Sequence, residues 1–213
     1  MTYLEIVNKV LVRLRETEVS SLNENSYSKL IADLVNVVKR EVENSWNWSC
    51  LRETLTLTTA PDLFNYVLTD FGTTSRVLNV YNDTEDILMH YRPSNWFDTE
   101  FRIVDTPQKD APMFYNWNGT SNGDLQVDVY PIPDKIYNLR FNVVKQQDDL
   151  VNGVDVPLIN HHLLIEGVIS RAISERGDDG GFLDQEARYK NMLSDFISIE
   201  AGHRPDEVTW YPS

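Results

Sequence analysis

The spacing of apolar residues changes twice along this chain, and the two changes limit the folds that it can adopt. Up to about residue 48, apolar side chains recur every three or four residues, which is typical of amphipathic helices. From Leu51 to about residue 143 they alternate with polar residues, as in half-buried strands. Helical spacing returns at Pro157. Helices therefore begin and end the chain, and strands lie between them.

Start and stop signals place four helices outside the strand region. Thr2 and Glu5 stand at the spacing of a capping box, which predicts a helix start. Pro157 can open a helix because its missing N–H is not needed there, and Gly177 can end that helix. The short loop after the first helix predicts that it pairs antiparallel with the second. We predict helices at about residues 2–15, 26–48, 157–175 and 182–201.

The clearest strand pair is a hairpin around the sequence NGTSNG, residues 118–123. Apolar residues alternate on both sides of this sequence, and its two Asn-Gly pairs can supply the positive φ angles that tight hairpin turns need. Further strands are predicted from alternation at about residues 51–58, 64–68, 78–80, 87–91 and 137–143, with turn residues at 82–84.

An α+β fold follows from this order of elements. We expect an antiparallel four-helix lobe with a small antiparallel β-sheet or barrel inserted into it. The helical lobe would comprise residues 1–49 and 157–203, the β-lobe residues 50–156, and an extended C-terminal arm residues 204–213.

Aromatic residues gather where helical spacing gives way to strand spacing. We interpret Trp46 and Trp48 as partly buried interface residues, since a large ring with one polar edge suits such a boundary. Stacking on a sugar or a base is the alternative.

Cys50 is interpreted as a buried, inert thiol and not as a nucleophile, because no His lies nearby in the sequence. Arg40 and Glu43 fall outside the apolar stripe of the preceding helix.

The charge of the chain argues against direct nucleic-acid binding. Acidic residues number 33 and basic residues 19, which gives a net charge of −14, and this balance repels phosphate. No apolar run approaches the roughly 18 residues of a membrane span. The start of the chain, MTYLEIVNKV, enters a helix and lacks the pattern of a secretion signal. We therefore expect a protein without membrane contact that is synthesised in a cytoplasm.

Residues that could carry catalysis are sparse. The sequence has no GxGxxG, P-loop, GxSxG or HExxH motif. Asp98 and Glu100, inside the aromatic segment NWFDTEF, are the carboxylates worth testing as a hydrolase pair. His161 and His162 are adjacent and so point in different directions from a helix, unlike a metal-binding i, i+4 pair. We expect no catalytic, cofactor or metal site.

The C-terminal segment HRPDEVTWYPS, residues 203–213, matches neither helix nor strand. Two prolines prevent a helix, and no alternation is long enough to pair as a strand. We interpret the segment as a docking arm for a partner, because Trp and Tyr often anchor interfaces; a disordered end is the alternative. The residues of the arm expected to make contact are Arg204, Val208, Trp210 and Tyr211.

Five segments carry a resemblance that extends over nearly the whole chain. They are TYLEIVNKVLVRLRE, SYSKLIADLVNVVKREVENSWNW, FNYVLTDFGTTSRVLNVYN, GDLQVDVYPIPDKIYNLRFNVVKQ and VPLINHHLLIEGVISRAISERG. In order and spacing they resemble the head-to-tail adaptor proteins of tailed bacteriophages, a group that includes tail tubular protein A of short-tailed phages. Thr69 departs from the pattern at a position where proline is expected in many relatives.

This resemblance implies a non-enzymatic virion protein at the head-tail junction. It would form a homo-oligomeric ring, typically of twelve copies, between the portal protein and the tail nozzle protein, and DNA would pass through without specific binding. The arm would dock on the portal, and the hairpin loop with Asn118 and Asn122 would face the nozzle. The acidic excess would line the channel, where twelve copies at −14 sum to about −168.

The alternative function is a tail-associated carbohydrate-binding or hydrolytic module. It would use Trp46, Trp48, Trp96 and Trp117 for stacking on sugar rings. Such a module would bind host polysaccharide as a free monomer.

Overall fold

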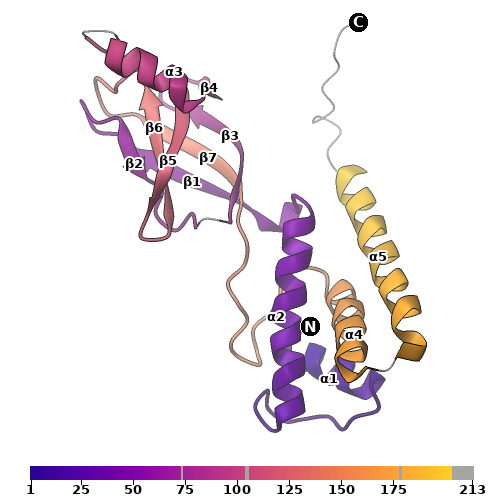
Figure 1. Cartoon of the computed structure of the whole chain (residues 1–213). Coiled ribbons are helices and arrows are strands. Elements are labelled where there is room, and N and C mark those ends of the chain that lie inside the picture. The colour runs from indigo at the N-terminus through magenta and orange to yellow at the C-terminus, as the bar shows by residue number, and fades with distance from the viewer. Residues whose placement is uncertain (73, 104–105, 178, 203–213) are drawn as a thin grey trace, which may run out of the picture. The chain divides into compact units, whose positions relative to one another are not determined.

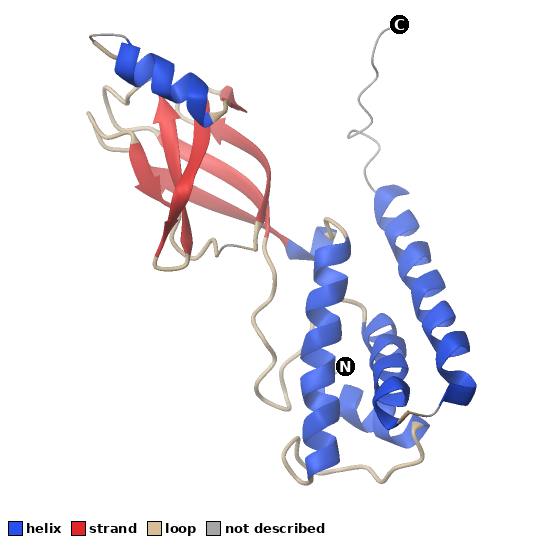
Figure 2. Cartoon of the chain, viewed as in Figure 1, coloured by secondary structure: helices blue, strands red, loops and turns tan. Residues whose placement is uncertain are grey.

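The chain divides into two compact units, one helical and one built on a β-sheet (Figures 1 and 2). The helical unit comprises residues 1–51 and the described part of 146–202, and the β-unit comprises residues 52–145. This mixed content confirms the predicted α+β class. The computed structural model describes residues 1–72, 74–103, 106–177 and 179–202.

The helical unit begins with the capping box predicted from the sequence. The Thr2 hydroxyl accepts a hydrogen bond from the Glu5 backbone N–H at 3.4 Å, and the Glu5 carboxylate accepts one from the Thr2 N–H at 2.8 Å. The second helix ends three residues before the predicted end, because Trp46 takes an extended conformation. The helices of this unit are α1 (Tyr3–Arg13), α2 (Ser26–Ser45), the short 3-10 turn η1 (Ser49–Leu51), α4 (His161–Arg176) and α5 (Asp179–Gly202).

A close approach at Gly167 brings three of these helices together. A Cβ atom added to Gly167 of α4 would lie 2.6 Å from a methyl carbon of Val38 in α2 and 2.8 Å from the Tyr189 ring in α5. Only glycine fits between helices this close. Around this point the apolar stripes interlock, and the fully buried side chains include Ile6, Val7, Ile31, Val35, Val42, Leu163, Leu164 and Val168.

The helix expected from Pro157 starts later, at His161. The Asn160 side chain caps it by accepting a hydrogen bond from the His162 backbone N–H at 2.9 Å. The preceding residues form no helix, and among them the Leu158 N–H donates a hydrogen bond to the Gln147 side chain at 3.0 Å. At the other end the predicted stop is confirmed, since Gly177 is left-handed with φ 68°.

The β-unit is a curled seven-stranded sheet in the order β1-β7-β3-β4-β5-β6-β2. All neighbouring strands are antiparallel except β4 and β5, which are parallel and pair Tyr91 with Tyr115. The expectation of a purely antiparallel sheet is therefore wrong at this pair. The strands are β1 (Arg52–Thr58), β2 (Asn65–Val67), β3 (Arg76–Asn82), β4 (Ile87–Tyr91), β5 (Phe114–Ser121), β6 (Asp124–Tyr130) and β7 (Asn138–Val144).

The parallel pair depends on a connection that the sequence reasoning missed. Parallel neighbours need a long crossover, because a tight turn can only reverse the chain. Between β4 and β5 this crossover contains the helix α3 (Ser94–Asp98), followed by the π-helical turn η2 (Thr99–Ile103). Each is only five residues long, too short to give a recognisable helical period.

One face of the sheet carries the core of the β-unit. Tyr115 and Trp117 of β5 point to this face and pack against it, partly buried. Alternation then sends Phe114, Asn116 and Asn118 to the opposite, outer face. The core side chains are Tyr66, Leu68, Phe71, Val80, Met89, Val127, Val129, Tyr137, Leu139, Phe141 and Val143.

Candidate functional site

The predicted hairpin is confirmed, and its turn lies at Asn122 and Gly123. These residues have φ angles of 52° and 92°, as a two-residue turn with positive φ requires. Asn118 is not in this turn. It lies inside β5, next to an irregularity in the pairing between Trp117 and Thr120. Of the two predicted nozzle-facing residues, only Asn122 therefore occupies the turn itself.

A polar cluster centred on Asp128 lies on the outer face of the sheet. Asn65 of β2 and Asn116 of β5 are the register partners of Asp128 in β6. The Asp128 carboxylate accepts hydrogen bonds from the Asn65 side-chain amide at 2.5 Å and from the Asn118 side-chain amide at 2.9 Å. Burial raises the pKa of Asp128, and these two bonds offset that effect only in part. Holding this carboxylate ionised therefore costs free energy.

Beside Asp128 opens a cleft of about 560 Å³, which we call the Asp128 cleft. Its floor is polar, and there the Asn116 side-chain amide donates to the Ser94 hydroxyl at 3.1 Å. Its walls are phenyl rings, and among the described residues that line it there is no Lys or Arg. The lining residues are Phe64, Ser94, Phe97, Asp98, Phe101, Asn116, Asn118 and Asp128.

Aromatic contacts fix the crossover over one end of the outer face. The Trp96 ring lies 4.9 Å from Phe114 and 5.6 Å from Tyr130, measured between centroids. Phe101 lies 5.3 Å from Tyr130 and 4.7 Å from Phe64. Ring pairs at these distances attract beyond their burial alone. The wall of the Asp128 cleft is therefore packed against the sheet through several rings.

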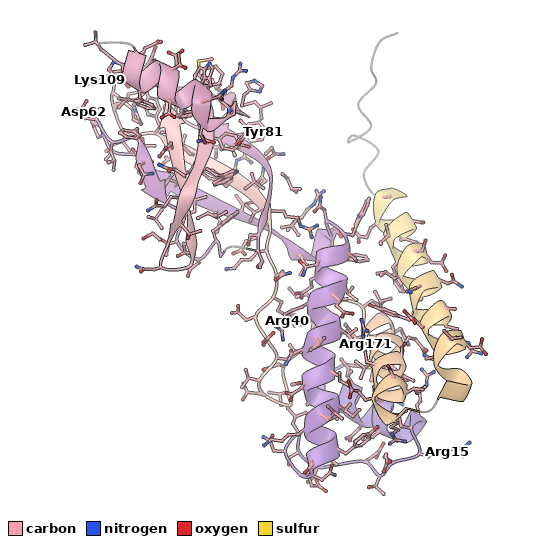
Figure 3. The ribbon with its side chains drawn as sticks, viewed as in Figure 1. Arg15, Arg40, Asp62, Tyr81, Lys109 and Arg171 are labelled. Atoms are coloured by element: carbon pink, nitrogen blue, oxygen red, sulfur yellow. The ribbon has the colours of Figure 1, made fainter. Side chains whose placement is uncertain are left out.

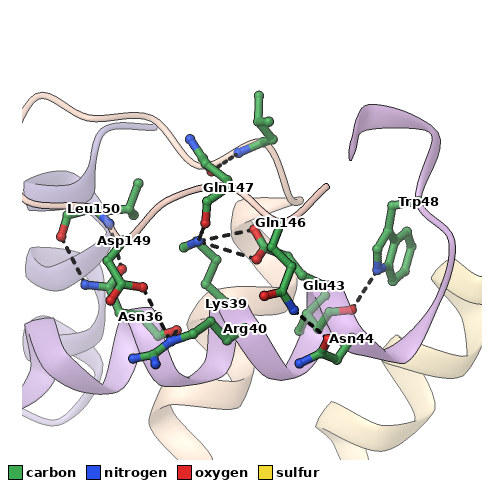
Figure 4. A network of polar contacts seen from close by, with 12 residues as sticks. Asn36, Lys39, Arg40, Glu43, Asn44, Trp48, Gln146, Gln147, Asp149 and Leu150 are labelled. Atoms are coloured by element: carbon green, nitrogen blue, oxygen red, sulfur yellow. Dashed lines mark hydrogen bonds and ion pairs between the residues drawn. The ribbon is translucent and has the colours of Figure 1, made fainter. Parts of the chain in front are cut away.

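In the helical unit, a row of polar side chains on α2 holds the return segment, residues 146–160, which leads into α4 (Figure 4). Asn36 binds both backbone groups of Leu150, accepting from its N–H at 2.9 Å and donating to its carbonyl at 3.0 Å. The Lys39 ammonium donates to the Gln147 carbonyl at 2.5 Å. These bonds satisfy backbone groups of a segment without regular secondary structure.

Lys39 also forms a buried ion pair with Glu43, one helical turn further along α2. The ammonium lies 3.3 Å from the carboxylate, and both side chains are fully buried. Burial raises the pKa of Glu43, and the attraction of Lys39 partly offsets this rise. The sequence placed Glu43 off the apolar stripe. Its burial follows from the return segment, which covers this side of α2 with backbone from a distant part of the chain.

The two units together match one known protein family. The sequence profile of the SU10 adaptor protein family matches residues 1–209. The chain belongs to this family. The predicted resemblance to phage head-to-tail adaptors is thereby confirmed. The protein is a structural adaptor of a phage. Its place is the virion head-tail junction, in association with portal and tail components. A search of curated proteins gives no significant match.

In the β-unit of the adaptor, the residues that the sequence suggested for hydrolysis or for sugar stacking do not share one site. Asp98 lines the Asp128 cleft, whereas Glu100 is not among the lining residues and accepts a hydrogen bond from the Tyr130 hydroxyl at 3.2 Å. Trp96 packs on the outer face, while Trp117 lies 5.9 Å from Phe71 in the core. Within the β-unit, neither pair forms a common site.

Trp48 of the adaptor is a core residue of the helical unit. It is 4% exposed, and its indole N–H donates to the Val42 carbonyl at 2.6 Å.

The prediction that Cys50 is buried is wrong: the thiol is exposed, because Trp48 and Leu51 take the inward positions around η1. Local desolvation and the nearby Glu200 carboxylate raise the pKa of Cys50, so at neutral pH the thiol stays protonated.

The predicted docking arm of the adaptor, with Arg204, Val208, Trp210 and Tyr211, lies outside the described residues and stays a prediction. In the part of the chain that the structure describes, no three His, Cys, Asp or Glu side chains are grouped to hold a metal ion. Over the same part, no helix is both long and apolar enough to cross a membrane.

Proposed function

We propose that the adaptor forms a homo-oligomeric ring, typically of twelve copies, between the portal protein and the tail nozzle protein, and that DNA passes through this ring. The observation that carries the proposal is the family match over residues 1–209, which spans both units and not a single shared module. Ring size comes from the resemblance to head-to-tail adaptors. Closed rings of identical copies use two different surfaces of each copy, one for each neighbour.

The charge pattern supports a channel that does not hold DNA. The net charge is −14, and basic side chains in both units form ion pairs with acidic ones, among them Lys109 with Asp62, which Figure 3 labels. A cation that is paired with a carboxylate attracts a phosphate backbone less strongly. We propose that the acidic excess lines the channel. Among the described residues, such ion pairs include Arg13–Glu166, Arg40–Asp149, Arg171–Glu41 and Arg176–Glu16 in the helical unit, and Lys109–Asp62, Lys135–Glu85 and Arg140–Asp83 in the β-unit.

Within this ring, we assign the two units different partners. The helices would form the ring and meet the portal with the C-terminal arm, residues 204–213, and the inserted β-lobe would extend toward the nozzle. The hairpin turn at Asn122 supports this assignment, since it is a two-residue turn at the end of the β5–β6 strand pair. Loops at the end of a rigid sheet are common places for recognition.

Native mass spectrometry tests the proposed function directly. The adaptor is measured alone and after mixing with the portal protein of the same phage. We expect a discrete complex with one adaptor per portal subunit. An adaptor that stays monomeric and ignores the portal would contradict the proposal.

Deletion of residues 205–213 tests the arm. Portal affinity should fall at least thirtyfold, because removal of Trp and Tyr anchors typically costs 2 kcal/mol or more of binding free energy. The melting temperature should remain nearly unchanged, since the deleted residues follow the last described helix. Affinity is measured by biolayer interferometry and stability by circular dichroism. The double variant Trp210→Ala, Tyr211→Ala is the control for chain length. Unchanged portal binding in the deletion variant would refute the docking arm.

A further inference from the structure

We propose that the Asp128 cleft receives an arginine side chain of the tail nozzle protein. This inference rests on the proposed function, because it requires that the β-unit meets the nozzle. It adds the chemistry of that contact, which is the insertion of one guanidinium group between a carboxylate and phenyl rings.

The electrostatics of the Asp128 cleft favour a cation. Asp128 is 8% exposed, so its charge is largely removed from water. It has two amide donors but no cation among the described lining residues, and Asp98 adds a second carboxylate to the lining. The buried Asp128 carboxylate repels a phosphate group or another acid. A cationic side chain from a partner would supply the charge that compensates Asp128.

The walls favour arginine over lysine. Phe64, Phe97 and Phe101 line the same cleft as Asp128. A guanidinium group is planar, so it can stack on a phenyl face while its N–H groups bind a carboxylate in two parallel hydrogen bonds. An ammonium group is a compact charge that uses neither feature as well. A volume of about 560 Å³ is within the range of sites that bury most of a small ligand.

The location of Asp128 also fits a role in an interface, and so does the free energy needed to keep its buried carboxylate charged. Asn118, which donates to Asp128, precedes the hairpin turn at Asn122 by four residues and belongs to the same strand pair. Part of the lining of the cleft thus belongs to the hairpin assigned to the nozzle. Burial raises the pKa of Asp128, so the free adaptor is destabilised by keeping this group charged. Sites that sacrifice stability in this way are common where function needs the group.

The test compares three substitutions that each remove one negative charge from the full-length adaptor. Binding to the purified nozzle protein of the same phage is measured by biolayer interferometry. We expect Asp128→Asn to weaken binding about tenfold or more, because it removes a desolvated charge at an interface. Asp98→Asn should weaken binding less, because Asp98 is exposed. Asp86→Asn is the matched control, since Asp86 lies in the β3–β4 turn with φ 56°, which Asn tolerates. It should bind as wild type does.

A second measurement decides the chemistry without the nozzle protein. N-acetyl-arginine amide and its neutral analogue N-acetyl-citrulline amide are titrated into isotope-labelled adaptor. The arginine compound should shift the side-chain amide NMR signals of Asn116 and Asn118, and the citrulline compound should not. In Asp128→Asn both compounds should leave the signals unchanged.

The outcomes separate the inference from the proposed function. If wild type binds the nozzle protein and Asp128→Asn binds it equally well, the inference is wrong and the adaptor role stands. If all three variants lose affinity to the same extent, net charge is responsible and the inference is again wrong. If wild type does not bind the nozzle protein, the tail partner in the proposed function is wrong. Should Asp128→Asn fail to fold, Asp98→Asn and the arginine titration of wild type decide the question.

Discussion

The substitution Lys39→Met should lower the free energy of unfolding of the adaptor by about 3–5 kcal/mol, the range for breaking a buried ion pair by removing one partner. Lys39 and Glu43 are fully buried, so the variant would keep a carboxylate in the protein interior without its counter-ion. The variant also loses the hydrogen bond from Lys39 to the Gln147 carbonyl. Both effects act on the contact between α2 and the return segment.

Urea unfolding followed by circular dichroism at 222 nm measures this loss, because the helical unit dominates that signal. The matched control is Arg40→Met on the same helix. Arg40 lies 3.4 Å from Asp149, but both side chains are about half exposed, so this substitution should cost no more than about 1 kcal/mol. The double variant Lys39→Met, Glu43→Leu should recover most of the loss, since it leaves no buried charge. Equal losses for Lys39→Met and Arg40→Met would contradict the assignment.

The loss should also depend on pH with a defined sign. Burial raises the pKa of Glu43 above its value in the unfolded chain, so the folded state binds this proton more tightly. The contribution of Glu43 to stability is therefore fully present below the unfolded pKa of about 4.3 and is lost as the pH rises through the folded pKa. Without Lys39 the folded pKa rises further. The difference between Lys39→Met and wild type should accordingly shrink as the pH falls from 7 toward 4, where the carboxyl becomes neutral.

The parts of the fold that were predictable depend on neighbours in the sequence. The capping box of Thr2 and Glu5, the left-handed stop at Gly177 and the hairpin turn at Asn122 each involve only a few consecutive residues. Local chemistry decides such features, so the sequence is sufficient. Prediction failed at Pro157, because contacts outside the immediate sequence pattern decide where this helix begins: the Leu158 N–H is bound to the Gln147 side chain, and Asn160 provides the cap.

The candidate sites were harder to predict because they join segments far apart in the sequence. Lys39 and Glu43 have the spacing of an ordinary exposed pair, and only the return segment more than 100 residues later buries them. The cluster around Asp128 left a clearer signal. Asn116 and Asn118 alternate with the apolar Tyr115 and Trp117, so two carboxamides must share one face of a strand. That pattern does not identify β6 as the partner strand, and it does not show that the crossover between β4 and β5 lines the cleft.

Trp48→Ala should lower the free energy of unfolding by about 3–5 kcal/mol, the range for truncating a buried Trp. Trp48 is 4% exposed and lies beside Ile159, Leu163 and Phe196 in the helical unit. Trp48→Phe should cost about 1 kcal/mol for the lost indole hydrogen bond, because the Val42 carbonyl still accepts one from the Ser45 hydroxyl.

Leu158→Ala is the control for the Trp48 variants, since Leu158 lines the same pocket but is 53% exposed; it should change stability by no more than about 0.5 kcal/mol. Urea unfolding by circular dichroism compares the three variants, and a glycan array of wild type accompanies it. A Trp48→Ala variant as stable as wild type, together with glycan binding that the substitution removes, would assign Trp48 to sugar stacking. The core role requires the opposite result, because a ring packed between α2 and α4 cannot be removed without leaving a cavity.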